Sequence, residues 1–205
     1  MNQVAMDRIQ RETFRELHRD GLTEVVAGVA LFVVALATGR PAFYWTYLAL
    51  IVILGPGLTR LRARYTYPRI GFAELTHESR RRLSRGIVVW VVGVALAVTA
   101  VLAVLGKLGN NLAWRRAAPL LGGLLFAGGL LYLAQRSGLK RVYGLAVASI
   151  ITGALLTWPE IEGAYANLRV WALLMALLCL AVGGLAFRRF VRETPVAEDW
   201  NPDVG

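Results

Sequence analysis

The chain has 205 residues, of which 57% are hydrophobic, and it carries a formal net charge of +10 at pH 7. A mean hydropathy of +0.53 is too high for an ordinary soluble domain and is typical of an integral membrane protein. The basic residues cluster between apolar runs, which indicates membrane orientation and attraction to anionic lipid, so we expect no nucleic-acid partner.

Residues 1–20 have the pattern of an amphipathic helix. At about 100° per residue, Met6, Ile9, Phe14 and Leu17 fall on one face, and arginines lie on the opposite face. We expect this segment to be cytoplasmic. Two placements stay open: packing against the cytoplasmic loops of the same chain, or lying on the inner leaflet with the apolar face down.

Six apolar runs follow, each long enough to cross a hydrocarbon layer of about 30 Å at about 1.5 Å per residue. They cover residues 22–39, 42–58, 86–106, 117–134, 142–158 and 170–187. Eighteen of the 23 Lys and Arg residues fall in the segments on one side of these runs. Because short loops rich in Lys and Arg stay in the cytoplasm, this bias predicts an all-α bundle of six transmembrane helices in the cell membrane, with both termini cytoplasmic. The membrane domain would cover residues 21–192, followed by a flexible cytoplasmic tail at 193–205.

Small residues recur four apart in the predicted spans, as in Gly123 with Ala127 and Ser149 with Gly153. This spacing predicts close approach of helix backbones in lipid, either within one chain or between chains. The hydroxyl groups of Ser149 and Thr152 are expected to donate to carbonyl groups of their own helix.

The loop between the second and third runs is strongly cationic, with eight arginines against Glu74 and Glu78. We expect its guanidinium groups to bind anionic lipid or acidic side chains of a partner, unless the loop serves only to orient the chain. Strand-forming residues at 64–67 and 70–73 flank Pro68 and Arg69 and predict a short hairpin. The eight arginines are Arg60, Arg62, Arg64, Arg69, Arg80, Arg81, Arg82 and Arg85.

Glu24 is the ionisable residue that comes closest to the interior of a predicted span. It follows Asp20 and Gly21 and falls in a first helical turn, where the helix dipole favours a carboxylate and surface arginines are within reach. The alternative is a proton or cation coupling site. The histidines, His18 and His77, are predicted to be surface residues, and the sequence contains no catalytic constellation, phosphate loop or metal-ligand set. We therefore expect neither enzymatic activity nor a cofactor.

Two short motifs stand out near the first hairpin: Asp20-Gly21-Leu22-Thr23-Glu24, and Thr66-Tyr67-Pro68-Arg69-Ile70-Gly71-Phe72. Together they resemble a family of uncharacterised prokaryotic multi-span membrane proteins. In that family an Asp-Gly pair opens the first span, and a Tyr-Pro-Arg-x-Gly-aromatic motif follows the first hairpin. Phe72 stands where the family pattern has a tyrosine. The resemblance covers residues up to about 75, and it implies a shared structural role for the loop but no activity.

The function expected from these features is that of an integral membrane scaffold or accessory subunit. Its partners would be anionic membrane lipids and a protein, either a different chain or further copies of this one. The alternative is a small-molecule or lipid transporter that functions as an oligomer, with Glu24 as its coupling group.

Overall fold

The computed structural model describes residues 15–38, 57–70, 111–159, 161 and 165–195, and the regular structure in these ranges is entirely helical. The long helices are α2 (Leu22–Ala37), α6 (Asn111–Ser137), α7 (Lys140–Leu155) and α8 (Ala166–Glu193). Residues 15–19 and 57–65 are also helical, and the short helix α4 (Tyr67–Ile70) follows a turn at Thr66. The all-α prediction is confirmed for this part of the chain.

Two helices are long and apolar enough to cross a membrane: Arg116–Ser137 within α6, and Ala166–Glu193, which is α8. Helix α2 is apolar but shorter, with 16 residues. Each of the predicted runs at 22–39, 117–134, 142–158 and 170–187 overlaps one of the long helices over most of its length. The runs at 42–58 and 86–106 lie outside the described residues, except for residues 57 and 58.

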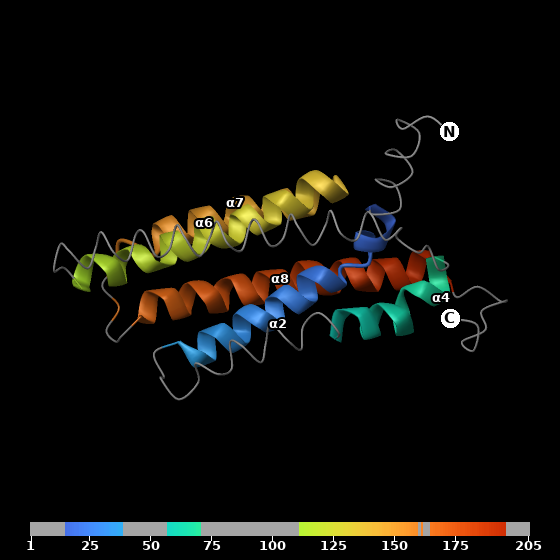
Figure 1. Cartoon of the computed structure of the whole chain (residues 1–205), viewed down its shortest axis with the longest axis horizontal. Coiled ribbons are helices and arrows are strands. Elements are labelled where there is room, and N and C mark those ends of the chain that lie inside the picture. The colour runs from blue at the N-terminus through green and yellow to red at the C-terminus, as the bar shows by residue number, and fades with distance from the viewer. Residues whose placement is uncertain (1–14, 39–56, 71–110, 160, 162–164, 196–205) are drawn as a thin grey trace.

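The long helices alternate in direction along the bundle (Figure 1). As a result, the starts of α2 and α7 and the ends of α6 and α8 gather at one end, together with α4. We call this the polar end and define it as residues 15–24, 62–70, 136–141 and 188–194. At the opposite end, Arg169 Nη2 donates to the carbonyl oxygen of Thr38 at 2.8 Å, and Asn167 Nδ2 donates to that of Leu156 at 2.8 Å.

Helices α6 and α7 pack at backbone contact through the small residues that the sequence singled out. A Cβ atom at Gly123 would lie 2.6 Å from the carbonyl oxygen of Ser149, and one at Gly153 would lie 2.7 Å from that of Pro119. The Ser149 hydroxyl donates to the Gly123 carbonyl at 2.9 Å, and Trp171 Nε1 of α8 donates to the Ser149 carbonyl at 3.3 Å. These contacts join helices within one chain.

The expectation that Ser149 donates within its own helix is therefore wrong, because the close approach of α6 brings the Gly123 carbonyl oxygen within hydrogen-bond distance. For Thr152 the same expectation is confirmed, since its hydroxyl donates to the Ala148 carbonyl at 2.7 Å.

Helices α2 and α8 form the second close pair. A Cβ atom at Gly28 would lie 2.8 Å from Leu180 Cγ, and one at Gly183 would lie 2.7 Å from the backbone nitrogen of Val25. Gly21, just before α2, has φ of 73°, and a Cβ atom there would lie 2.5 Å from the Gly183 carbonyl oxygen. Glycine is required at Gly21 both by its left-handed backbone and by this close approach.

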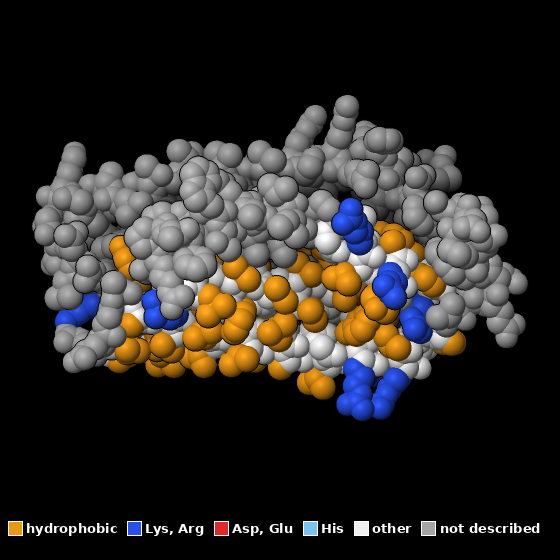
Figure 2. All heavy atoms as spheres, turned by 90° about the horizontal axis from the view of Figure 1, so that it is seen from below, with side chains coloured by type: hydrophobic (Ala, Val, Ile, Leu, Met, Phe, Trp, Pro, Cys, Tyr) orange, Lys and Arg blue, Asp and Glu red, His pale blue; other side chains and the backbone are white. Residues whose placement is uncertain are grey.

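Small side chains fill much of the bundle interior beside larger ones such as Trp171 and Met175, while many other large apolar side chains point outward. Every long helix carries at least one alanine that is at most 1% exposed. Figure 2 shows hydrophobic side chains along the middle of one face, with Lys and Arg toward its ends. Small residues inside and large apolar residues outside are typical of helices that pack in lipid. The exposed large residues on the long helices include Val29, Phe32, Leu36, Leu124, Val147, Ile151, Leu155, Leu174, Leu177 and Leu185.

Candidate functional site

Asp20 is the centre of the polar end. Its side chain is fully buried, and Oδ1 accepts a hydrogen bond from the Leu22 backbone N–H at 3.0 Å. Oδ2 accepts from Thr66 Oγ1 at 2.9 Å and from Arg62 Nε at 3.3 Å. Arg62 Nη2 also donates to Thr23 Oγ1 at 2.9 Å. This network joins the two sequence motifs, which lie more than forty residues apart, into one buried unit.

Helical periodicity explains why Arg62 turns inward while its neighbours do not. In the helix at 57–65, Arg60 and Arg64 are four residues apart and share an exposed face, whereas Arg62 lies about 200° around the axis and is 8% exposed. The hairpin predicted around Pro68 is wrong over residues 64–70, because these residues form two helical segments joined by a turn at Thr66. Arg62, which we expected to contact lipid or a partner, instead neutralises a buried carboxylate.

Arg69 joins the same segment to the end of α8 through hydrogen bonds. Its Nη1 donates to the carbonyl oxygens of Thr194 at 2.7 Å and Val191 at 3.3 Å, and its Nε donates to that of Tyr65 at 3.1 Å. The carbonyl groups at a helix C-terminus have no partner within the helix and carry partial negative charge, so a guanidinium group is well placed there. Within the predicted motif loop, Pro68 is buried and Tyr67 half-buried, and Gly71 and Phe72 lie outside the described residues.

Glu24 pairs with an arginine from another helix. Its carboxylate is 2% exposed, and Oε1 accepts from Arg141 Nε at 2.7 Å. Arg141 also donates from Nη2 to the His18 carbonyl at 2.6 Å and from Nη1 to the Arg19 carbonyl at 3.2 Å. One guanidinium group at the start of α7 thus holds the N-terminal segment and the first turn of α2. This arrangement agrees with the expectation that Glu24 reaches an arginine.

The N-terminal segment contacts the rest of the chain at residues 18–20, as in the packing alternative for the predicted amphipathic helix. His18 is 8% exposed, so the prediction of a surface histidine is wrong at this position, because the segment folds over the ends of the helices. His77 lies outside the described residues, as do Arg80, Arg81, Arg82 and Arg85 and the N-terminal residues 1–14.

The predicted tail begins at Glu193, which is the last residue of α8 and lies beyond the predicted span 170–187. Its Oε1 accepts from Arg189 Nε at 2.6 Å, and its Oε2 accepts from Arg19 Nη2 at 2.9 Å. The hydrogen bond from Arg189 is the main cause of the lowered pKa of the Glu193 carboxyl. Residues 196–205 of the tail are outside the described ranges.

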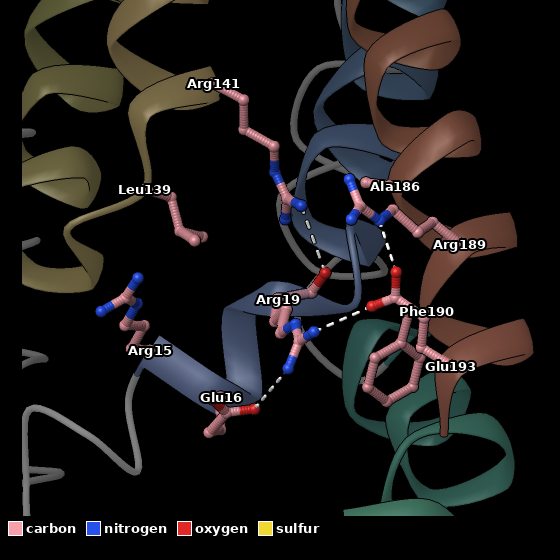
Figure 3. Close-up of a pocket in the computed structure, with 9 residues that line it drawn as sticks. All are labelled: Arg15, Glu16, Arg19, Leu139, Arg141, Ala186, Arg189, Phe190 and Glu193. Atoms are coloured by element: carbon pink, nitrogen blue, oxygen red, sulfur yellow. Dashed lines mark hydrogen bonds and ion pairs between the residues drawn. The ribbon is translucent and has the colours of Figure 1, made fainter. Parts of the chain in front are cut away.

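A pocket lies beside these ion pairs, where the N-terminal segment, the start of α7 and the end of α8 meet (Figure 3). Its volume is about 330 Å³, and arginines and glutamates form most of its lining. Among the residues that the structure describes, no group of three His, Cys, Asp or Glu side chains could hold a metal ion.

Sequence reasoning missed that Asp20 and Arg62 are partners. The available signal was the spacing of Arg62, Thr66 and Arg69, which puts them on one helical face opposite Arg60 and Arg64. The strand propensity of the residues around Pro68 instead favoured a hairpin.

Comparison of the chain with protein-family models, curated proteins and solved structures finds no match.

Proposed function

We propose that the chain is an integral membrane protein, a bundle of six transmembrane helices with both termini in the cytoplasm. In this arrangement the polar end faces the cytoplasm, and the exposed leucines and valines of α2, α7 and α8 contact lipid. The protein acts as a scaffold or accessory subunit. Its cationic surface contacts anionic lipid or the acidic side chains of a partner, which is either another protein or a second copy of the chain.

The observation that carries this proposal is the anchored helix at 57–65. Arg62, Thr66 and Arg69 are held by the N-terminal segment and by the end of α8, so the orientation of the whole segment is fixed. Arg60 and Arg64 project from its opposite, exposed face. Because the backbone that carries Arg60 and Arg64 is anchored, binding orders only their side chains, and each guanidinium group suits the bidentate geometry of phosphate or carboxylate. The remaining predicted arginines of the loop, at 80–85, would extend this surface.

The resemblance suggested by the two motifs fits the same account. Asp20 and Thr66 meet directly, which supports a shared structural role for the Asp-Gly pair and the Tyr-Pro-Arg segment. We propose that any protein with both motifs uses them to fix the helix after the second span.

The transporter alternative is supported by one observation at Glu24. Its Oε2 is buried and accepts no hydrogen bond from the described residues. The pairing of Oε1 with Arg141, however, supports a structural role. In the Glu24→Gln variant Arg141 keeps an acceptor at position 24 and its two carbonyl partners, and its side chain is partly exposed to solvent. A scaffold would therefore keep its assembly, whereas a transporter coupled through this carboxylate would lose coupled uptake.

The experiment compares two double charge reversals at the polar end. In R60E/R64E the changed residues lie on the proposed surface; in the control, R188E/R192E, they are also four apart and exposed, but on α8. Each variant is purified in mild detergent, and the co-purifying proteins and anionic lipids are quantified. We expect R60E/R64E to lose about 90% of the bound partner or lipid, as the loss of about 1.4 kcal/mol implies. Equal losses in both variants, or none in R60E/R64E, would contradict the proposal.

A further inference from the structure

The pocket at the polar end has an excess of positive charge. Its lining includes four arginines against two glutamates, which leaves a formal charge of +2. The four arginines come from the N-terminal segment, α7 and α8, so their positions depend on the fold and not on one helix face. The charged lining residues are Arg15, Arg19, Arg141, Arg189, Glu16 and Glu193.

The glutamates leave much of this charge unneutralised. Glu193 accepts from one nitrogen of Arg189 and one of Arg19, at 2.6 Å and 2.9 Å, and Glu16 lies 3.7 Å from Arg19 Nη1. Arg15 forms no ion pair with the part of the chain that the structure describes, and Figure 3 shows its side chain beside the pocket without a dashed contact. The terminal nitrogens of Arg189 likewise make no hydrogen bond within the described ranges.

Arg141 contributes to the pocket in a different way. All its hydrogen bonds go to Glu24 and to the carbonyl groups of residues 18 and 19, so its guanidinium group is held in place at the edge of the pocket. Leu139, at the start of α7, and Ala186 and Phe190, on α8, are the apolar residues of the lining, and Figure 3 shows Leu139 on the opposite side of Arg19 from Phe190. A ligand that matches this mixed lining carries an anionic group joined to an apolar part. The volume, about 330 Å³, is at the lower end of the range for small-molecule sites.

We propose that this pocket binds the phosphate group of an anionic phospholipid. Arg15, Arg19 and Arg189 contact the phosphate oxygens, and Phe190 and Leu139 contact the glycerol and the first carbons of the acyl chains. The pocket lies at the end of α8, one of the helices able to cross a membrane, where headgroup phosphates are found and basic pockets between helices bind them. The inference rests on the membrane placement proposed above, but it does not depend on Arg60 or Arg64.

The test measures lipid binding to full-length protein in a nonionic detergent. The probes are phosphatidylglycerol, zwitterionic phosphatidylcholine and inorganic phosphate. The pocket variant R15A/R189A removes two exposed guanidinium groups, and R188A/R192A is the control, with two exposed arginines that do not line the pocket. Because these side chains are exposed, both variants should fold, which circular dichroism checks.

We expect the unchanged protein to bind phosphatidylglycerol about tenfold more tightly than phosphatidylcholine, and R15A/R189A to lose about tenfold in affinity for phosphatidylglycerol. The control should stay within about twofold. An equal loss of phosphatidylglycerol affinity in R15A/R189A and R188A/R192A would contradict the proposed binding site. If inorganic phosphate displaces the lipid at equal concentration, the phospholipid assignment is overturned in favour of a soluble phosphate compound. If R60E/R64E loses affinity for phosphatidylglycerol and R15A/R189A does not, the proposed function is supported and the lipid site in this pocket is contradicted.

Discussion

Replacement of Asp20 with Asn tests the buried network that joins the two motifs. Asp20 is fully buried and the Arg62 side chain is 9% exposed, so solvent screens their interaction very little. Asn keeps an acceptor for the Leu22 N–H but loses the charge, which leaves the Arg62 guanidinium buried without a counter-ion. Removing one partner of a buried ion pair typically costs about 3–5 kcal/mol, and we expect D20N to lower the free energy of unfolding by about that amount.

The free energy is measured by titrating detergent-solubilised protein with SDS and following its circular dichroism. The single variants D20N and R62Q are compared with the double variant D20N/R62Q. Because the two side chains contact each other, the double variant should lose at least about 1 kcal/mol less than the sum of the single losses. As a matched acid-to-amide control, E16Q changes an exposed carboxylate and should lose no more than about 1 kcal/mol.

Two results would contradict the role of the Asp20–Arg62 ion pair. A loss below about 1 kcal/mol in D20N would show that the ion pair does not hold the segment at 57–70. Strict additivity of D20N and R62Q would show that the two side chains do not interact.

The remaining stability predictions use the same SDS titration. G21A should lower the free energy of unfolding by at least about 2 kcal/mol, because alanine is strained at φ of 73° and its Cβ would meet the α8 backbone. The control is Gly144, where an added Cβ would meet nothing within 4 Å. G144A should raise the free energy of unfolding by about 0.5–1 kcal/mol. If the free energy of unfolding of G21A is not lower than that of the unchanged protein, the close approach is contradicted. R141Q should cost about 3–5 kcal/mol because Glu24 loses its counter-ion, whereas exposed Lys140 is expected to tolerate Gln within about 0.5 kcal/mol. Equal stability of R141Q and K140Q would show that the Glu24 pair contributes nothing.

Helix positions were the most predictable part of the fold. Apolar length alone places a helix in the runs at 22–39, 117–134, 142–158 and 170–187. The four-residue spacing of Gly123 with Ala127 and of Ser149 with Gly153 predicts close approach of helix backbones, and the structure adds that α6 and α7 are the helices that meet there. Both signals lie within the sequence of a single helix. One is the apolar length needed to cross a bilayer, and the other is the spacing of small residues that lets another backbone come close.

The contacts at the polar end were less predictable, because they depend on which segments meet. Arg62 and Arg60 have the same chemistry and lie two residues apart, yet one neutralises Asp20 and the other is exposed. The difference follows from helical geometry. The strand-forming residues Tyr65 and Tyr67 favoured a hairpin instead of a helix in the prediction. Arg141 similarly shows nothing in its local sequence that identifies Glu24, 117 residues away, as its partner.

Labelling of single cysteines in intact bacterial cells shows whether the polar end of a membrane bundle faces the cytoplasm. Arg60 is exposed on the anchored helix near the polar end, and Trp158, 86% exposed, follows α7 at the opposite end. Native Cys179 is fully buried and should contribute little background, which the C179A variant checks. We expect a membrane-impermeant maleimide to label W158C in intact cells and to label R60C only after permeabilisation. Equal labelling of W158C and R60C in intact cells would contradict it.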